Sequence, residues 1–122
     1  MTPRSALEIV SAYQDAWTSK DFDTAAAFLA DDVEFHSPQQ DITSVANFIS
    51  MLTAFAERIA PRWELVAATR GGDDNSVLIL YNLFTLDGTA AICADHFTLA
   101  AGKIQSETLV FDPKPFLAAR EH

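Results

Sequence analysis

Several features that define large classes of proteins are scarce or absent in this sequence. One cysteine, Cys93, among 122 residues makes an internal disulfide impossible and fits a reducing compartment. No apolar run approaches the roughly 18 residues that a membrane-spanning helix needs, and the N-terminus lacks an apolar signal core. These absences predict a cytoplasmic protein.

Positive charge is also scarce. The chain has 8 lysines and arginines against 17 aspartates and glutamates, for a net charge of −9. A nucleic-acid or anionic-membrane surface needs a basic patch, so we expect neither partner.

Motifs for phosphate, metal and nucleophile chemistry are missing as well. The sequence has no Gly-x-Gly-x-x-Gly, Walker or nucleophile-elbow pattern, and Gly71-Gly72 is typical of a turn. Its three histidines and single cysteine show no ligand spacing such as His-x-x-x-His. We therefore predict no cofactor and no metal site.

What the chain does have is apolar content of 49% in a length that suits one domain, residues 1–122. Hydrophobic periodicity and turn residues predict three helices, at 3–19 after a Thr2 cap, 23–29 and 44–59. They predict five strands, at 33–37, 63–69, 76–86, 89–99 and 103–111, with a short tail helix at 116–120. This order indicates an α+β fold in which a curved, mostly antiparallel sheet wraps around a long helix and leaves a cone.

The Asp87-Gly88 pair is a strong signal for a two-residue hairpin turn. That turn would place Asp95 opposite Leu80, Cys93 opposite Asn82, and Phe97 opposite Leu78. The other face of the hairpin is also apolar, so we expect a second copy of the chain to cover it in a homodimer. The expected outer sheet face consists of Val77, Ile79, Tyr81, Leu83, Ile92 and Ala94.

One carboxylate stands in an apolar row of the strand at 89–99. Alternation places Asp95 between Cys93 and Phe97 on one face. A carboxylate there must be paired, hydrogen-bonded or protonated, and an apolar environment raises its pKa. What Asp95 faces is therefore the main functional question.

Three local patterns resemble the nuclear transport factor 2-like superfamily, in its SnoaL-like and ketosteroid isomerase-like branch. They are a tyrosine in the first helix, an Ala-Asp-Asp-Val segment leading into Phe-His-Ser-Pro, and an Asp-His-Phe segment followed by Gly-Lys-Ile. The resemblance extends over nearly the whole chain. The matching residues are Tyr13, Ala30–Val33, Phe35–Pro38, Asp95–Phe97 and Gly102–Ile104.

The resemblance implies roles for two residues. As described for ketosteroid isomerase, a tyrosine and a protonated aspartic acid donate hydrogen bonds to the substrate oxyanion, and Tyr13 and Asp95 match these positions. We accordingly expect a hydrogen bond between Tyr13 and Asp95. The aspartate that acts as the base is replaced by Ser37, and a serine cannot accept a proton at neutral pH without a base of its own.

The missing base could be His36, Glu107 or a water held by Ser37, and His36 and Glu107 each have a structural alternative. An imidazole side chain can act as a base, which makes His36 a candidate, but alternation favours a position on the rim for it. Glu107 is either a second carboxylate near the pocket or an exposed rim residue. The expected pocket lining is Trp17, Phe35, Phe48, Leu52, Phe55, Leu80, Asn82, Phe84, Cys93, Phe97, Glu107 and Leu109.

Three functions remain open at this point. The first is a cofactor-free isomerase, polyketide cyclase-like or dehydratase-type enzyme acting on a small apolar carbonyl or hydroxylated molecule. The second is a protein that binds such a molecule without catalysis, and the third is a protein-interaction domain. The first two need a cavity of about 300 Å³ or more, whereas a filled cone favours the third.

Overall fold

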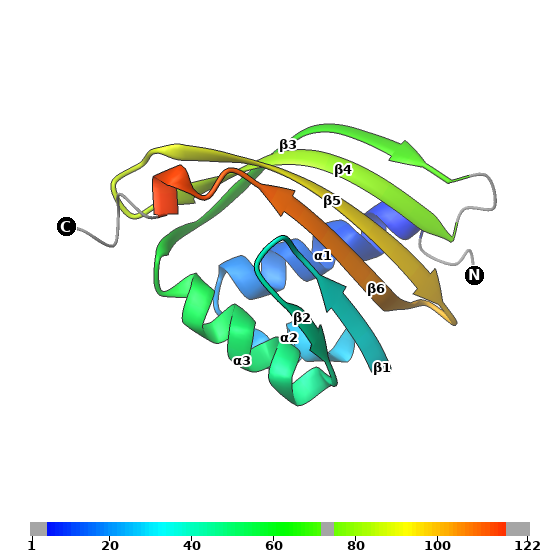
Figure 1. The fold of residues 1–122 in the computed structure, drawn as a ribbon. Coiled ribbons are helices and arrows are strands. Elements are labelled where there is room, and N and C mark those ends of the chain that lie inside the picture. Colours follow the sequence, from blue (N-terminus) through cyan, green and yellow to red (C-terminus); the bar gives the residue numbers. More distant parts are fainter. Residues whose placement is uncertain (1–4, 72–74, 117–122) are drawn as a thin grey trace.

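The computed structural model describes residues 5–71 and 75–116 and shows three helices on the concave side of one curved sheet (Figure 1). The helices are α1 (Ala6–Thr18), α2 (Phe22–Ala27) and α3 (Val45–Ala56). The strands are β1 (Leu29–His36), β2 (Asp41–Thr43), β3 (Ile59–Arg70), β4 (Ser76–Thr85), β5 (Ala90–Ala100) and β6 (Lys103–Phe111).

The sheet has the strand order β2-β1-β6-β5-β4-β3. Only β1 and β6 pair in parallel; the other neighbours are antiparallel. The sheet stays open, with β2 and β3 at its edges, so the predicted α+β cone is confirmed. Within the described part of the chain, none of the helices is long and apolar enough to cross a membrane.

The first helix begins later than predicted. Ser5 is its N-cap: the Ser5 side chain accepts from the Glu8 backbone, and the Glu8 side chain accepts from the Ser5 backbone. This capping box satisfies two backbone N–H groups and fixes the start at Ala6, not at residue 3. The expected Thr2 cap lies outside the described residues, as does most of the expected tail helix, 117–120.

The region around α3 also differs from the prediction. The helix ends at Ala56, and Ile59 already belongs to β3. Pro61 lies inside β3, which tolerates it because an edge strand does not need every N–H group. The short strand β2 lies in a segment where no strand was predicted, and β1 begins four residues before the predicted start at Val33.

The hairpin between β4 and β5 has a three-residue loop, and this changes its register. Thr85 and Thr89 close the loop, and Gly88 adopts a φ of 87° and donates its N–H to the Thr85 carbonyl at 2.9 Å. Asp95 consequently pairs with Ile79 instead of Leu80. A slip of one residue moves every side chain of a strand to the opposite face.

The slip corrects the expected composition of both faces. Four residues expected on the outer face lie on the inner face and are buried: Val77, Ile79, Tyr81 and Leu83. The alternate residues of β4 face outward together with Ile92 and Ala94, and Leu78, Ile92 and Val110 are 44%, 52% and 59% exposed. The homodimer stays a prediction, and the outward-facing residues of β4, β5 and β6 are the ones that would form its interface.

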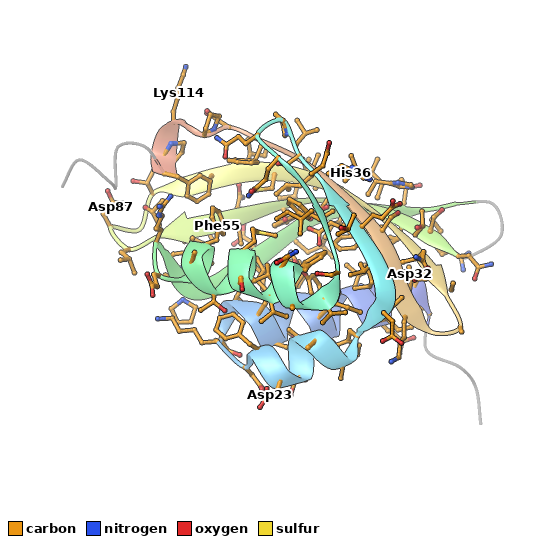
Figure 2. The ribbon with its side chains drawn as sticks, turned by 60° about the horizontal axis from the view of Figure 1, so that its bottom comes forward. Asp23, Asp32, His36, Phe55, Asp87 and Lys114 are labelled. Carbon is orange, nitrogen blue, oxygen red and sulfur yellow. The ribbon has the colours of Figure 1, made fainter. Side chains whose placement is uncertain are left out.

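The core fills the space between the sheet and the helices (Figure 2). Tyr13 is at its centre, edge-on to Phe48 at 6.4 Å and to Phe97 at 6.0 Å between ring centroids. Phe35 packs against Phe48 in the same way at 5.4 Å. These rings connect α1, α3, β1 and β5, and hold the inner face of the sheet at a fixed distance from α3.

Candidate functional site

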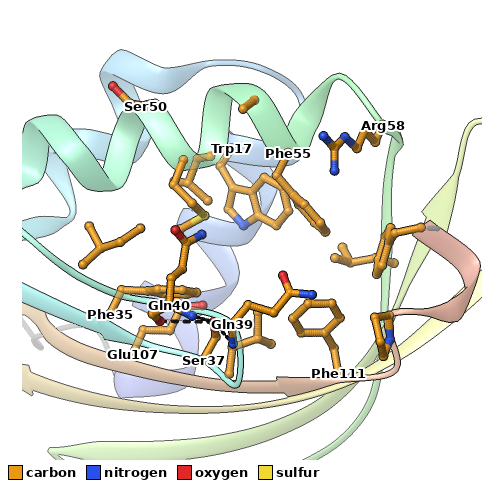
Figure 3. A pocket seen from close by; sticks show the side chains of 18 of the residues that line it. Trp17, Phe35, Ser37, Gln39, Gln40, Ser50, Phe55, Arg58, Glu107 and Phe111 are labelled. Carbon is orange, nitrogen blue, oxygen red and sulfur yellow. Dashed lines mark hydrogen bonds between the residues drawn. The ribbon is translucent and has the colours of Figure 1, made fainter. Parts of the chain in front are cut away.

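A cavity of about 590 Å³ lies between α3, the β1–β2 hairpin and the inner face of the sheet (Figure 3). Its apolar lining comes from α1, α3, the sheet and the C-terminal segment, and consists of Trp17, Phe35, Ile42, Met51, Leu52, Ala54, Phe55, Leu83, Leu109, Phe111, Pro113 and Phe116. Its polar lining residues are Ser37, Gln39, Gln40, Asn47, Ser50, Arg58, Tyr81 and Glu107.

Half of the residues predicted to line the pocket do line this cavity. The residues that line the cavity as expected are Trp17, Phe35, Leu52, Phe55, Glu107 and Leu109. Phe48, Cys93 and Phe97 are buried in the core instead. The other three, Leu80, Asn82 and Phe84, were wrongly placed because the register slip turns them to the outer face.

The same slip brings Tyr81 and Leu83 to the cavity, and sequence reasoning missed both. If the loop around Gly88 had been predicted to contain three residues, the sequence would have placed Tyr81 and Leu83 on the inner face. Phe111 and Phe116 were missed for a different reason: the chain turns after β6, and the segment around Phe116 packs back against α3, with 4.8 Å between the Phe55 and Phe116 ring centroids.

Two carboxyl groups and two tyrosines form a buried polar network beside the cavity. The Tyr13 hydroxyl donates to Glu107 Oε1 at 3.1 Å, and the Tyr81 hydroxyl donates to Asp95 Oδ2 at 3.0 Å. The expected Tyr13–Asp95 hydrogen bond is therefore wrong. Its place is taken by Tyr81, which the register slip turns to the inner face beside Asp95.

Burial dominates the electrostatics of this network. Asp95 is 0% and Glu107 is 4% exposed, and loss of hydration raises the pKa of both carboxyls. The neighbouring Glu107 raises the Asp95 pKa further, while the hydrogen bonds from Asp95 and Tyr13 hold the Glu107 pKa down. Burial also raises the pKa of Tyr13 and Tyr81, so both remain protonated donors.

The environment of one Asp95 oxygen suggests that the Asp95 and Glu107 carboxyls share a proton. The buried oxygen Asp95 Oδ1 has no hydrogen-bond partner among the described residues. Glu107 lies two residues from Leu109, the β6 residue that pairs with Asp95, and its carboxyl raises the Asp95 pKa. A proton shared by the two groups would satisfy this oxygen, so we expect the pair to titrate as a unit.

The network reaches the cavity through only two of its members. Tyr81 and Glu107 line it, whereas Tyr13 and Asp95 are fully buried behind them. In this structure neither Tyr13 nor Asp95 lines the cavity, and their oxyanion-binding role stays a prediction. Glu107, weighed in the sequence against an exposed rim position, is buried and is the carboxyl that lines the cavity.

Ser37 and His36 are unsuited to act as the base. Ser37 lines the cavity, but its hydroxyl accepts from the backbone N–H groups of Gln39 and Gln40 and donates to the Gln40 carbonyl. It stabilises the β1–β2 turn. The His36 side chain is 45% exposed, and its Nδ1 lies 3.0 Å from Asp41 Oδ1. It does not line the cavity, in agreement with a position on the rim.

Cys93 is an apolar core residue. Its side chain is buried, and burial raises the pKa of the thiol to about 12. A thiol that stays protonated at neutral pH is a poor nucleophile and a poor metal ligand.

The carboxyl pair predicts how stability depends on pH. Because both folded pKa values exceed the unfolded ones, the pair favours folding most at low pH, and this contribution is lost as pH rises from about 4 through the folded pKa values. We expect the free energy of unfolding, measured with urea, to fall between about pH 5 and about pH 8. In Asp95→Asn the fall should be smaller; an equal or larger fall in this variant would contradict the assignment.

Comparisons with known proteins agree with this architecture. The family model described as SnoaL-like domain matches residues 10–107. A protein of known structure from Kribbella flavida is 31% identical over 96% of this chain and 94% of its own, with a TM-score of 0.84. No curated protein matches the sequence.

More distant structures share the fold. A nuclear transport factor 2-like protein of unknown function from Cytophaga hutchinsonii is 18% identical, covering 96% of this chain and 99% of its own, with a TM-score of 0.76. A protein with a ketosteroid isomerase-like fold from Catenulispora acidiphila, solved in complex with trimethylamine, is 19% identical over 92% and 91% of the two chains, with a TM-score of 0.75. The chain belongs to the SnoaL-like domain family, and it shares its fold with these nuclear transport factor 2-like and ketosteroid isomerase-like proteins.

Proposed function

We propose that this protein binds a small, mostly apolar organic molecule in its cavity, with Glu107 in contact with the polar atom of that molecule. The observation that carries the proposal is a buried carboxyl at the wall of an otherwise largely apolar cavity. The volume of about 590 Å³ exceeds the roughly 300 Å³ that a drug-sized ligand needs. The side chains leave this cavity open and do not fill the cone, whereas a filled cone would favour a pure protein-interaction domain.

The distribution of polar groups supports a defined orientation for the ligand. Gln39, Gln40, Asn47 and Ser50 are exposed cavity residues, whereas Glu107 is buried. An apolar body would displace water from the aromatic walls, and one polar atom would meet the carboxyl. The trimethylamine complex of the Catenulispora acidiphila protein supports this use of the fold, since that protein was solved with a small organic molecule.

Proton transfer is a second candidate function, and Glu107 favours it. A carboxyl with a raised pKa in an apolar site can donate or accept a proton near neutral pH, as cofactor-free isomerases, cyclases and dehydratases require. The Tyr13 hydroxyl fixes one Glu107 oxygen in place. The protein would need no second base if Glu107 removes a proton and returns it.

Binding is tested with cyclohexanone, a small ketone, observed by ligand-detected NMR. We expect the parent to bind it and Glu107→Gln to bind it about 3- to 10-fold more weakly, because the hydrogen bond to the ketone oxygen changes. Glu34→Gln is the matched control, since Glu34 is an exposed glutamate on β1 that does not line the cavity. No binding by the parent, or equal weakening by the control, would contradict the proposal.

Proton transfer is tested by exchange of the ketone α-protons for deuterium in D₂O. General acid–base catalysis contributes about 10²-fold or more, so the parent should accelerate exchange clearly above the buffer rate. Glu107→Gln should return the rate to that of buffer. Ser37→Ala should keep the acceleration, because the Ser37 hydroxyl is engaged in the β1–β2 turn. A parent that binds the ketone without accelerating exchange is a binding protein.

A further inference from the structure

We infer that the cavity prefers a molecule whose polar group is a cationic nitrogen, that is, an organic ammonium carried on a small apolar frame. The inference rests on the proposed function and deepens it by naming the ligand class. Two independent features of the site support it: the carboxyl pair has no basic partner, and the cavity walls are rich in aromatic rings.

The carboxyl pair lacks a counter-charge within the described residues. Asp95 accepts a hydrogen bond from the neutral hydroxyl of Tyr81, and Glu107 accepts one from the neutral hydroxyl of Tyr13. Arg58 is the single basic side chain that lines the cavity; it is exposed, and Figure 3 shows it far from Glu107. Buried acidic groups without a basic partner either hold a proton or attract a cation.

The aromatic lining provides the second contribution. Six aromatic side chains line the cavity, from four different regions of the fold: Trp17, Phe35, Phe55, Tyr81, Phe111 and Phe116. Ring faces carry partial negative charge and attract ammonium groups, most strongly where water is excluded. Apolar walls alone would hold a neutral molecule equally well, so the combination of aromatic rings with a carboxyl is what selects a cation.

The charge of the whole molecule acts in the same direction. With 17 acidic and 8 basic residues, the chain attracts cations and repels anions at long range. An anionic ligand would meet this field and the carboxyl pair together. A neutral ligand would gain no charge–charge attraction from either.

The groups that face Glu107 determine how cation binding depends on pH. Tyr13 on α1, Tyr81 on β4 and Cys93 on β5 have raised pKa values and stay neutral. Among the described residues of this site, the charged or ionisable side chains that remain are Asp95, Glu107 and the exposed Arg58. Binding a cation should release the proton that the pair holds, so affinity for a permanent cation should rise with pH until the pair is ionised.

The test compares choline with 3,3-dimethylbutan-1-ol, which has the same shape and no charge. Affinities are measured by calorimetry and NMR at about pH 6 and about pH 8 for the parent, Glu107→Gln and Glu34→Gln. We expect choline to bind at least about tenfold more tightly than the alcohol, with a preference that grows at the higher pH. Glu107→Gln should lose the preference and still bind the alcohol, while Glu34→Gln should behave as the parent.

Each other outcome has a separate meaning. Equal affinity for the two molecules at both pH values overturns the ammonium inference and leaves the proposed binding function intact. Failure of the parent to bind either molecule, or cyclohexanone, overturns both. If Glu107→Gln does not fold, as judged by circular dichroism, the pH dependence of the choline preference in the parent decides the matter alone.

Discussion

The rest of this structure depends on two carboxyl groups that lie on neighbouring strands and are almost completely buried. Asp95 and Glu107 each need a donor, and the fold supplies Tyr81 from β4 and Tyr13 from α1. These bonds tie α1 and three strands around one point on the inner face of the sheet. The same burial that makes the charged form of the pair unfavourable also raises the pKa of Glu107 at the cavity wall.

The fold could be predicted from the sequence, because hydrophobic periodicity and turn residues determine the order of elements. The site could be predicted only in part. Asp95 was identified as the unusual residue because it interrupts an apolar row, and Glu107 was a candidate. Their partners were not correctly assigned, because a single extra loop residue at Gly88 exchanged the two faces of β4 and brought Tyr81 inward.

The departures from the isomerase pattern form a consistent set. Ser37 occupies the position of the base, and its hydroxyl is committed to a backbone turn. The residues that match the oxyanion-binding pair are buried behind the cavity wall. Within a shared fold, the carboxyl that lines the cavity of this chain is Glu107 on β6, and family membership alone does not specify the chemistry.

The central claim is that Asp95 and Glu107 form one coupled acid group beside a ligand cavity. Carbon-13 NMR titration of the two side-chain carboxyls tests it most directly. The account predicts that both carboxyls titrate above the ordinary range for aspartate and glutamate, that their titration curves are coupled, and that Tyr81→Phe raises the Asp95 pKa further by removing the hydrogen bond that favours its ionised form. Independent titration of both groups at ordinary pKa values would contradict it.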